Sequence, residues 1–327
     1  MKRDLFVEAE RFPLAAAFTI SRGSKTEAAV VTCTISEGNN AGRGECVPYA
    51  RYGETIESVL GQIEAMRGAI AGGMSREELK AKMKAGAARN AIDCALWDLE
   101  AKSDGKRAHE RLSATAPEAL TTAYTISLGE PDAMAAQARK HAHRSLLKVK
   151  VGTSDDTSRI AAVAEAAPRS RIILDANEGW SETDIVMHML TAARHRIALI
   201  EQPLPAGQDD ILRRIPHPVP ICADESVHTA ENLEELLGLY DAVNIKLDKT
   251  GGLTAALELR DRARELGFGV MVGCMVGTSL AMAPALLVAQ DADFVDLDGP
   301  LLLARDRETP LAYEGSQVAP PEPALWG

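Results

Sequence analysis

The feature that most constrains the fold is a series of short apolar segments, most of which end in charged residues. LLKVKV begins at residue 146, RIILDA at 171, IALIEQ at 197, VPICAD at 219, AVNIKL at 242 and VMVG at 270. Successive segments lie roughly 25 residues apart, which leaves room for one strand, one helix and two tight loops. Such alternation predicts an α/β fold with a covered parallel sheet, and six or more units favour a closed barrel. A doubly wound open sheet is the competing fold.

The first 112 residues have a different pattern. Alternating apolar runs, such as AAVVTCTI at 28–35, predict antiparallel strands, and from Ile56 onward the apolar spacing becomes helical. The sequence therefore predicts an α+β domain over residues 1–112. A barrel domain over 113–303 begins at the stretch SATAPEA, and a proline-containing tail over 304–327 returns to the first domain.

Composition argues against several classes of partner. The chain has 36 Lys and Arg against 47 Asp and Glu, a net charge of −11, which argues against nucleic acid and anionic membranes. Its five cysteines are widely spaced without a CxxC pair, which indicates neither a disulfide framework nor a zinc site. No signal peptide or long apolar stretch is apparent, so we expect a soluble, cytoplasmic protein. The sequence leaves open whether it forms a homo-oligomer.

Three acidic residues close consecutive predicted strands: Asp175, Glu201 and Asp224. In a barrel the C-terminal ends of the strands form one mouth, where active sites lie. A hard cation such as Mg²⁺ takes carboxylate oxygens and keeps positions for water or substrate. We therefore predict one Mg²⁺ per subunit, held by these acids.

Lysines flank the acids on both sides. Lys148 and Lys150 lie two apart on one strand, so both point into the barrel, and Lys246 lies three strands further round. Repulsion and burial are expected to lower the pKa of whichever of Lys148 and Lys150 lies deeper. A base on each side of one carbon is what inversion of a stereocentre requires. With a metal to stabilise the developing charge, one lysine removes the α-proton of a carboxylate substrate and the other returns it.

Each of these residues also has a plain structural interpretation. A single buried Asp or Lys is more often part of an ion pair than a catalyst, but six such residues ending successive strands favour a site. Asp93 and Asp98, on the predicted helix, are expected to be structural. Cys274 either lines the barrel or contacts the substrate. Gly251 and Gly252 are expected to form a tight turn, with phosphate binding as the alternative.

The ordered motifs KVK (148–150), DAN (175–177), EQP (201–203), DES (224–226) and NIKLDKTGG (244–252) resemble the muconate-lactonizing subgroup of the enolase superfamily. The segment GAARNAIDCALWDLEAK (86–102) extends the resemblance into the first domain. It implies a (β/α)7β TIM-like barrel beneath an α+β capping domain. It also implies that Lys150 and Lys246 are the acid/base residues, that Lys148 tunes Lys150, and that the reaction passes through an enediolate. A lysine base with Mg²⁺ is a known pairing in this superfamily.

Within that subgroup, DLDGP (296–300) resembles the Asp-x-Asp element of dipeptide epimerases, whose acids hold the free α-ammonium of the substrate. GCMVGTS (273–279) and RYGE (51–54) resemble the L-Ala-D/L-Glu epimerase branch, which acts on murein peptides. The resemblance implies a dipeptide as the small-molecule partner. The substrate contacts expected from it are Asp296, Asp298, Tyr52, Thr125 and Cys274, and the residues expected to support the metal ligands are Asn177 and Glu225.

The side-chain specificity depends on the first loop of the capping domain. A glutamyl side chain needs a cation, and ISRGSK offers Arg22 and Lys25, of which we expect at least one to bind it. An N-acylamino-acid racemase or o-succinylbenzoate synthase is the nearest alternative, but two extra carboxylates would repel such anionic substrates. A pyridoxal-phosphate racemase and a non-catalytic barrel are more distant alternatives.

Overall fold

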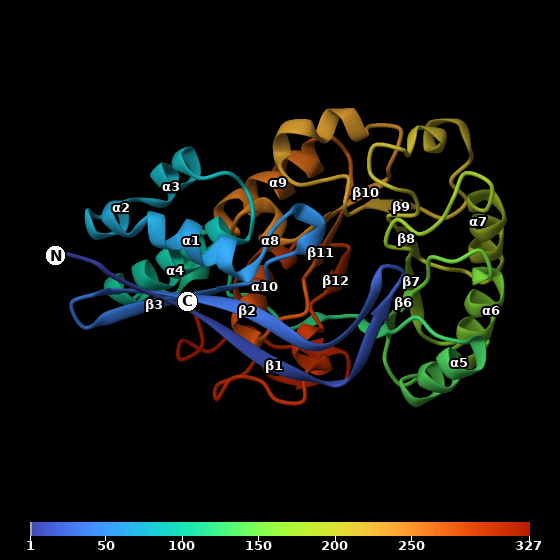
Figure 1. The fold of residues 1–327 in the computed structure, drawn as a ribbon. Helices are drawn as coiled ribbons and strands as arrows, with labels where there is room; N and C mark the ends of the chain where they lie inside the picture. The colour runs from blue at the N-terminus through green and yellow to red at the C-terminus, as the bar shows by residue number, and fades with distance from the viewer. Residues whose placement is uncertain (1) are drawn as a thin grey trace.

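The structure is a computed structural model that describes residues 2–327. A three-stranded antiparallel sheet and four helices form one side of the molecule, and an eight-stranded parallel sheet with its helices forms the other (Figure 1). The predicted fold class, a (β/α)7β barrel beside an α+β unit, is confirmed.

The N-terminal sheet is built by two long strands and a short third. β1 (Asp4–Ile20) pairs with β2 (Gly23–Glu37), and β2 pairs with β3 (Asn40–Cys46). One face of this sheet packs against α4 (Ala87–Asp104), whose apolar side chains share a buried cluster with those of β2. A Cβ on Gly44 would lie 2.1 Å from Ala91 O, so only glycine permits this close approach. The remaining helices of this unit are α1 (Ile56–Ala65), α2 (Arg67–Ala71) and α3 (Arg76–Lys82).

The barrel strands follow one another in chain order around the sheet, all parallel to their neighbours. They are β5 (Tyr124–Ile126), β6 (Leu146–Lys150), β7 (Arg171–Asp175), β8 (Leu199–Glu201), β9 (Ile221–Ala223), β10 (Ala242–Ile245), β11 (Gly269–Gly273) and β12 (Phe294–Asp296). Ala123 N donates to Val295 O at 2.8 Å, which brings the two ends of the sheet together. Sequential order and closure exclude the doubly wound alternative.

Seven connections cover the outside of the barrel. Five contain α-helices: α5 (Pro131–Lys140), α6 (Asp156–Ala166), α7 (Ile185–Arg194), α9 (Leu253–Glu265) and α10 (Ser279–Ala289), with the single turn α8 (Leu247–Thr250) before α9. The other two contain 3-10 helices, η3 (Asp210–Arg214) and η4 (Ala230–Leu236). The strand interiors are almost wholly apolar and buried, so the charged strand ends stand out as a group at one mouth.

The last residues of the chain pack against α4. Trp326 Nε1 donates to Cys94 O at 3.0 Å, and Gly327 N donates to Asp98 Oδ1 at 2.7 Å. A small sheet joins β4 (Leu120–Thr121), β13 (Tyr313–Glu314) and β14 (Gln317–Val318). The boundaries 112/113 and 303/304 stay predictions. Of the helices formed by residues 2–327, none has both the length and the apolar content needed to cross a membrane.

Candidate active site

The C-terminal ends of the central strands bring the predicted charged residues together. Lys150, Asp175 and Glu201 end β6, β7 and β8 and are cross-strand neighbours in the register. Asp224 directly follows β9, and Lys246 directly follows β10. All five side chains are buried. Acids on three neighbouring strands therefore lie in a row between the two lysines.

Lys148 is the deeper lysine of β6, 2% exposed against 7% for Lys150. Its Nζ lies 2.7 Å from Glu201 Oε2, 2.8 Å from Asp296 Oδ2 and 3.0 Å from Asp175 Oδ2. Burial opposes the ammonium charge, but these carboxylates raise the pKa of Lys148 well above its usual value. The prediction of a lowered pKa for the deeper lysine is therefore wrong, because the neighbouring acids outweigh the effect of burial.

Lys150 and Lys246 approach the row of acids from its two ends. Lys150 Nζ lies 2.5 Å from Asp175 Oδ2, and Lys246 Nζ lies 2.6 Å from Asp224 Oδ2. Burial again opposes the charge of Lys246, yet Asp224 and Glu201 raise its pKa well above the usual value. Glu201 lies on the strand between those of Asp175 and Asp224. Burial and the charge of Asp175 raise its pKa to about 7. Lys150 and Lys246 thus contact the two ends of a buried acidic row.

The three acids have the oxygen chemistry that Mg²⁺ prefers. Burial works against their charge, but the lysines hold the pKa values of Asp175 and Asp224 below the usual range. Glu201 Oε2 makes no hydrogen bond beyond its ion pair with Lys148, and the buried Asn177 Oδ1 has no hydrogen-bond partner. Within residues 2–327 no three His, Cys, Asp or Glu side chains have the arrangement of a preformed metal site, and the acid oxygens face ammonium groups instead. The residues fit a magnesium site by donor chemistry and strand position.

The backbone is strained directly after two of these strands. Asn177, Glu178 and Gln202 have φ values of 45°, 67° and 34°, a region that residues other than glycine rarely adopt. Asn177 N donates to Asp175 Oδ1 at 3.0 Å, and Gln202 Oε1 accepts from Asp224 N at 2.8 Å. Such strain is characteristic of functional sites, and here it aims backbone and side-chain groups at the acids.

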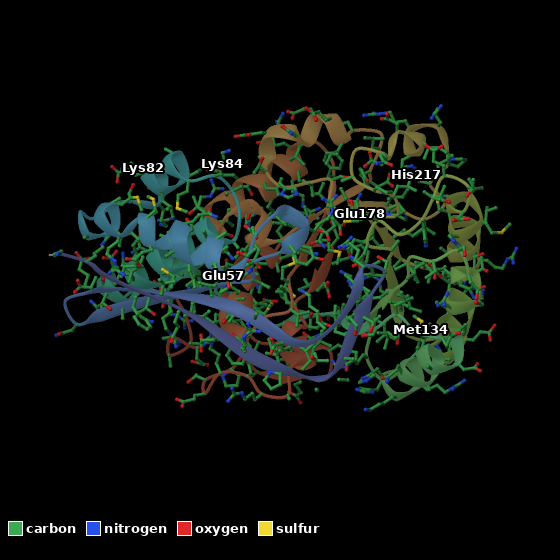
Figure 2. All side chains as sticks on the ribbon, viewed as in Figure 1. Glu57, Lys82, Lys84, Met134, Glu178 and His217 are labelled. Carbon is green, nitrogen blue, oxygen red and sulfur yellow. The ribbon has the colours of Figure 1, made fainter. Side chains whose placement is uncertain are left out.

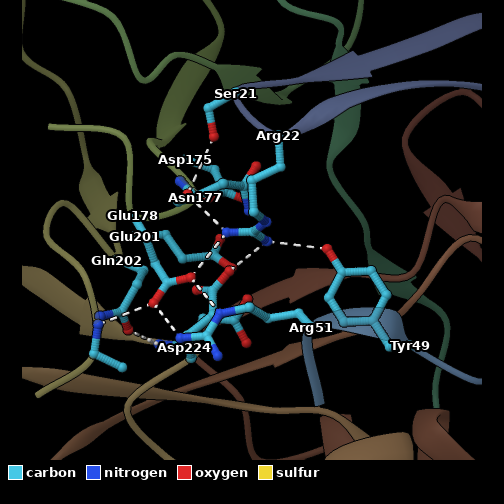
Figure 3. Close-up of polar contacts among 12 residues, drawn as sticks. Ser21, Arg22, Tyr49, Arg51, Asp175, Asn177, Glu178, Glu201, Gln202 and Asp224 are labelled. Atoms are coloured by element: carbon cyan, nitrogen blue, oxygen red, sulfur yellow. Dashed lines mark hydrogen bonds and ion pairs between the residues drawn. The ribbon is translucent and has the colours of Figure 1, made fainter. Parts of the chain in front are cut away.

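The turn between β1 and β2 reaches from the N-terminal sheet to this mouth. Ile20 pairs with Gly23, so Ser21 and Arg22 form the tip of the hairpin. Arg22 donates to Asn177 O at 2.7 Å and to Tyr49 Oη at 2.9 Å, and forms ion pairs with Glu225 at 2.7 Å and Glu178 at 3.1 Å (Figure 3). Arg51 also pairs with Glu178, at 2.8 Å. In Figure 2 Glu178 lies over the barrel, to the right of the labelled Glu57, Lys82 and Lys84 of the N-terminal unit.

The predicted Asp-x-Asp pair, Asp296 and Asp298, lies at the end of β12, where Asp296 contacts Lys148. Asp296 Oδ2 is ion-paired with Lys148, while its buried Oδ1 has no hydrogen-bond partner. Asp298 Oδ2 accepts from Thr125 N at 2.6 Å. Burial and the adjacent Asp296 raise the pKa of Asp298 to about 7. Asp296 Oδ1 is therefore able to accept a hydrogen bond from a bound molecule.

The other predicted substrate contacts are only partly brought together. Tyr52 Oη is buried without a hydrogen-bond partner, and its ring meets the ring of His228 edge-on at 4.6 Å. Cys274 follows β11, where burial and the charges of Asp296 and Asp298 raise its thiol pKa well above the usual value. Lys25 is exposed, and its Nζ lies 5.3 Å from the Tyr49 ring centroid. Tyr52 and Cys274 therefore border the charged cluster, whereas Lys25 stands outside it.

Asn244 and Lys249 contact carboxylates of the site and were not predicted from the sequence. Asn244 Nδ2 donates to Glu201 Oε1 at 2.8 Å, and Lys249 Nζ contacts Asp224 Oδ1 at 2.5 Å. Asn244 lies two residues before Lys246, so strand alternation could have placed it on the same face. Lys249 follows Lys246 at helical spacing, but nothing in the sequence shows that a helical turn begins there. The glycines after it form a tight turn, as expected: a Cβ on Gly251 would lie 2.3 Å from Arg89 Nε.

Comparisons with known proteins agree with this geometry. Residues 2–111 match the model of the N-terminal domain of mandelate racemase / muconate lactonizing enzyme, and residues 133–323 match the enolase C-terminal domain-like model. The L-Ala-D/L-Glu epimerase of Escherichia coli is 45% identical over 97% of this chain and 99% of its own. The N-acetyl-D-glutamate racemase of a Pseudoalteromonas species is 45% identical over 91% of this chain and 95% of its own.

Two solved structures extend the comparison. An enolase family member from Agrobacterium tumefaciens, with homology to dipeptide epimerases and bound sodium and L-Ala-L-Glu, is 60% identical with a TM-score of 0.99 and covers 99% of this chain and 100% of its own. A dipeptide epimerase from Enterococcus faecalis, complexed with Mg and L-Leu-L-Tyr, is 29% identical with a TM-score of 0.91 and covers 98% of both chains. The chain belongs to the mandelate racemase and muconate lactonizing group of the enolase superfamily.

Proposed function

We propose that this protein epimerises dipeptides, with L-Ala-L-Glu and L-Ala-D-Glu as its substrate pair and one Mg²⁺ per subunit. The observation that carries the proposal is the placement of Lys150 and Lys246 at opposite ends of the buried row Asp175, Glu201 and Asp224. A structural ion-pair cluster has no need of lysines at both ends, whereas inversion of a stereocentre does.

The reaction follows from the positions of these residues. When bound, Mg²⁺ held by Asp175, Glu201 and Asp224 supplies charge stabilisation for the substrate carboxylate. Lys150 takes the α-proton on one side, and Lys246 returns a proton on the other; the reverse reaction exchanges their roles. Lys148, fixed by three carboxylates, maintains a positive charge beside Lys150.

The free α-ammonium of a dipeptide fits the remaining acids. Asp296 Oδ1 is buried and lacks a hydrogen-bond partner, and an ammonium donor would satisfy it. Asp298, fixed through Thr125 N, adds a second oxygen acceptor. Thr125, Tyr52 and Cys274 are the further proposed substrate contacts. Asn177 supports Asp175 through its backbone N, whereas Glu225 is ion-paired with Arg22. The Escherichia coli relative is named an L-Ala-D/L-Glu epimerase, and the Agrobacterium tumefaciens structure holds L-Ala-L-Glu. Both support this assignment.

Solvent deuterium incorporation into L-Ala-L-Glu, followed by mass spectrometry with Mg²⁺ and with EDTA, tests the proposal. We expect exchange at the glutamyl α-carbon, with formation of the D-Glu epimer, only in the presence of the metal. Exchange that survives EDTA together with a cofactor absorbance would point to a pyridoxal-phosphate enzyme. Bound Mg²⁺ without exchange on any dipeptide would refute epimerisation.

The Pseudoalteromonas relative gives a second candidate, racemisation of an N-acylated glutamate. N-acetylglutamate has no α-ammonium, so Asp296 would then stay beside Lys148 with one oxygen unsatisfied. We expect kcat/KM for L-Ala-L-Glu to exceed that for N-acetyl-L-glutamate. Asp296→Asn removes a charge that attracts the ammonium. It should therefore lower the ratio of kcat/KM for L-Ala-L-Glu to kcat/KM for N-acetyl-L-glutamate. A ratio that favours N-acetylglutamate in the wild type would support racemisation.

We further propose that murein peptides are the source of the substrate. Comparing kcat/KM for L-Ala-L-Glu with the values for L-Ala-L-Leu and L-Ala-L-Lys tests this choice. A preference for either uncharged or cationic second residues would contradict it.

A further inference from the structure

Lys249 lies beneath the acidic row on a single helical turn. After β10 the chain enters α8, with Lys246 as its N-cap and Lys249 three residues later. Residues three apart in a helix lie on the same side, so both ammonium groups reach Asp224. Gly251 ends the turn with φ 80°, and Arg89 Nε donates to Gly251 O at 3.0 Å. The turn that carries Lys249 is thus held at its far end by α4.

The ammonium of Lys249 has no donor to spare. Its Nζ contacts Asp224 O and Asp224 Oδ1, each at 2.5 Å, and Asn244 O at 3.0 Å. An ammonium has three N–H donors and no acceptor, so this set is complete. The side chain is only 1% exposed. Lys249 therefore has no free N–H group for a substrate, and its position is fixed.

These contacts determine how Asp224 can act. Oδ1 is held by Lys249, Oδ2 lies 2.6 Å from Lys246 Nζ, and the backbone N donates to Gln202 Oε1 at 2.8 Å. Asp224 is fixed at its backbone N and at Oδ1. Its carboxylate therefore cannot rotate without breaking the buried charged hydrogen bond to Lys249. Lys249 occupies Oδ1, so Oδ2, next to Lys246, is the carboxylate oxygen left for a further ligand.

We propose that Lys249 is a positioning residue: it fixes Asp224 so that a single oxygen, Oδ2, is presented to a divalent cation next to Lys246. This inference rests on the proposed function, in which Asp224 is one of the metal ligands. Loss of a residue that orients a metal ligand typically weakens metal affinity about 10–100-fold. Lys249→Gln should weaken Mg²⁺ binding by that factor.

The test is titration calorimetry with Mg²⁺ alone on the EDTA-treated 327-residue chain. The matched control is Lys102→Gln, because Lys102 Nζ also binds a buried aspartate and a backbone carbonyl, Asp98 Oδ2 at 2.7 Å and Ala41 O at 3.1 Å, away from the site. We expect weaker binding only for Lys249→Gln. Equal affinities in both variants and the wild type would overturn the role of Lys249, whereas no binding to the wild type would instead refute the metal of the proposed function.

Thermal unfolding in EDTA separates this role from a general loss of stability. A purely structural lysine would lower the unfolding temperature and leave the Mg²⁺ affinity of the folded protein unchanged, which would also overturn the proposal. If Lys249→Gln does not fold, Lys249→Arg carries the test, since it keeps the buried charge but alters the donor geometry. An affinity several-fold below the wild type is expected, and an unchanged affinity would contradict the fixed position of Asp224.

Discussion

Lys150 and Lys246 lie at opposite ends of the acidic row, so each should serve one stereoisomer. In Lys246→Ala, we expect epimerisation to fall by at least about 10²–10⁴-fold, the usual contribution of one acid/base group. Lys150 should still exchange the α-proton of the isomer that points toward it. In Lys150→Ala, only the opposite isomer should exchange its α-proton for solvent deuterium. Mass spectrometry of L-Ala-L-Glu and L-Ala-D-Glu, each incubated in D₂O, measures both.

Lys102→Ala is a suitable control for this pair, because its ion pair with Asp98 lies on α4. Loss of exchange for both isomers in each single lysine variant would argue against separate roles. It would favour a site in which one lysine acts and the other only supports it.

Residue types and spacing predicted the acids and three of the lysines, but not their environment. Asp175, Glu201 and Asp224 could be predicted because charged residues interrupt otherwise apolar strands. The pKa of Lys148 could not, since burial lowers it while close contacts with Asp175, Asp296 and Glu201 raise it, and spacing in the sequence does not give these distances. Lys249 was missed for a similar reason: its partners are set by a turn whose start only the folded chain shows.

At the scale of elements, the β1–β2 hairpin joins the two parts of the molecule at the site. Arg22 and Lys25 are both exposed, but Arg22 at the tip of the hairpin binds Glu225, Glu178, Asn177 and Tyr49, whereas Lys25 contacts the Tyr49 ring. We therefore expect Arg22→Ala to raise KM for L-Ala-L-Glu and for L-Ala-L-Leu alike, because it releases the hairpin. Lys25→Ala should raise KM for L-Ala-L-Glu alone, since it removes a charge without detaching the hairpin.

Steady-state kinetics on both dipeptides measures the effect. A loss confined to L-Ala-L-Glu in Arg22→Ala would show that this guanidinium leaves its protein partners for the substrate. Unchanged turnover of L-Ala-L-Glu in both variants would refute the expectation that either residue binds the glutamyl side chain.

The junction of α8, β3 and α4 should make stability depend on pH. Asp248 Oδ1 accepts from Val47 N at 3.0 Å and from Asn90 Nδ2 at 2.8 Å, and burial raises the pKa of Asp248 to about 7. Between pH 4 and 7 the folded protein retains a proton that the unfolded chain has released. Its stability therefore falls as pH rises through this window and levels off above pH 7.

Asp248→Asn keeps the acceptor oxygen and removes this titration. The unfolding temperature of the wild type, minus that of the variant, should decrease from pH 5 to pH 8; each unit of pKa shift is worth about 1.4 kcal/mol. Other titrating groups are common to both proteins and cancel in the difference. A constant difference over this range would contradict the raised pKa.

The order of elements was largely predictable, whereas the shortest elements were not. The strands from 146 to 272 follow the apolar segments, because a parallel strand that is buried on both faces consists almost wholly of apolar residues. β5 was missed, since Tyr124–Ile126 is too short to show a period. The expected helices after β8 and β9 are 3-10 segments, whose hydrogen-bond pattern the apolar spacing does not distinguish from α-helix.

At the scale of the whole molecule, the last residues of the chain pack against α4 of the N-terminal unit. Trp326 belongs to the same buried cluster as Trp97 of α4 and Leu287 of α10, so the last turn of the chain joins α4 to the barrel. In Figure 1 both ends of the chain lie on the side of the N-terminal sheet. These contacts are remote from the acidic row, so they bear on the stability of the fold and not on its chemistry.

Trp326→Ala tests this connection. The side chain is 1% exposed and donates from Nε1 to Cys94 O at 3.0 Å, so its loss should reduce the free energy of unfolding by about 3–5 kcal/mol. Trp326→Phe keeps most of the buried area and loses the hydrogen bond, at a cost of about 1 kcal/mol. Met187→Ala, at a residue 60% exposed on α7, should change stability by less than about 0.5 kcal/mol.

Urea unfolding followed by circular dichroism gives these free energies, and kcat at low temperature gives the activity of the molecules that stay folded. We expect kcat of folded Trp326→Ala to match the wild type, because none of the acids or lysines of the site contacts Trp326. A fall in kcat without a fall in stability would mean that the position of the last turn is transmitted to the barrel mouth. The path would then run through α4, which holds the turn carrying Lys249 by way of Arg89.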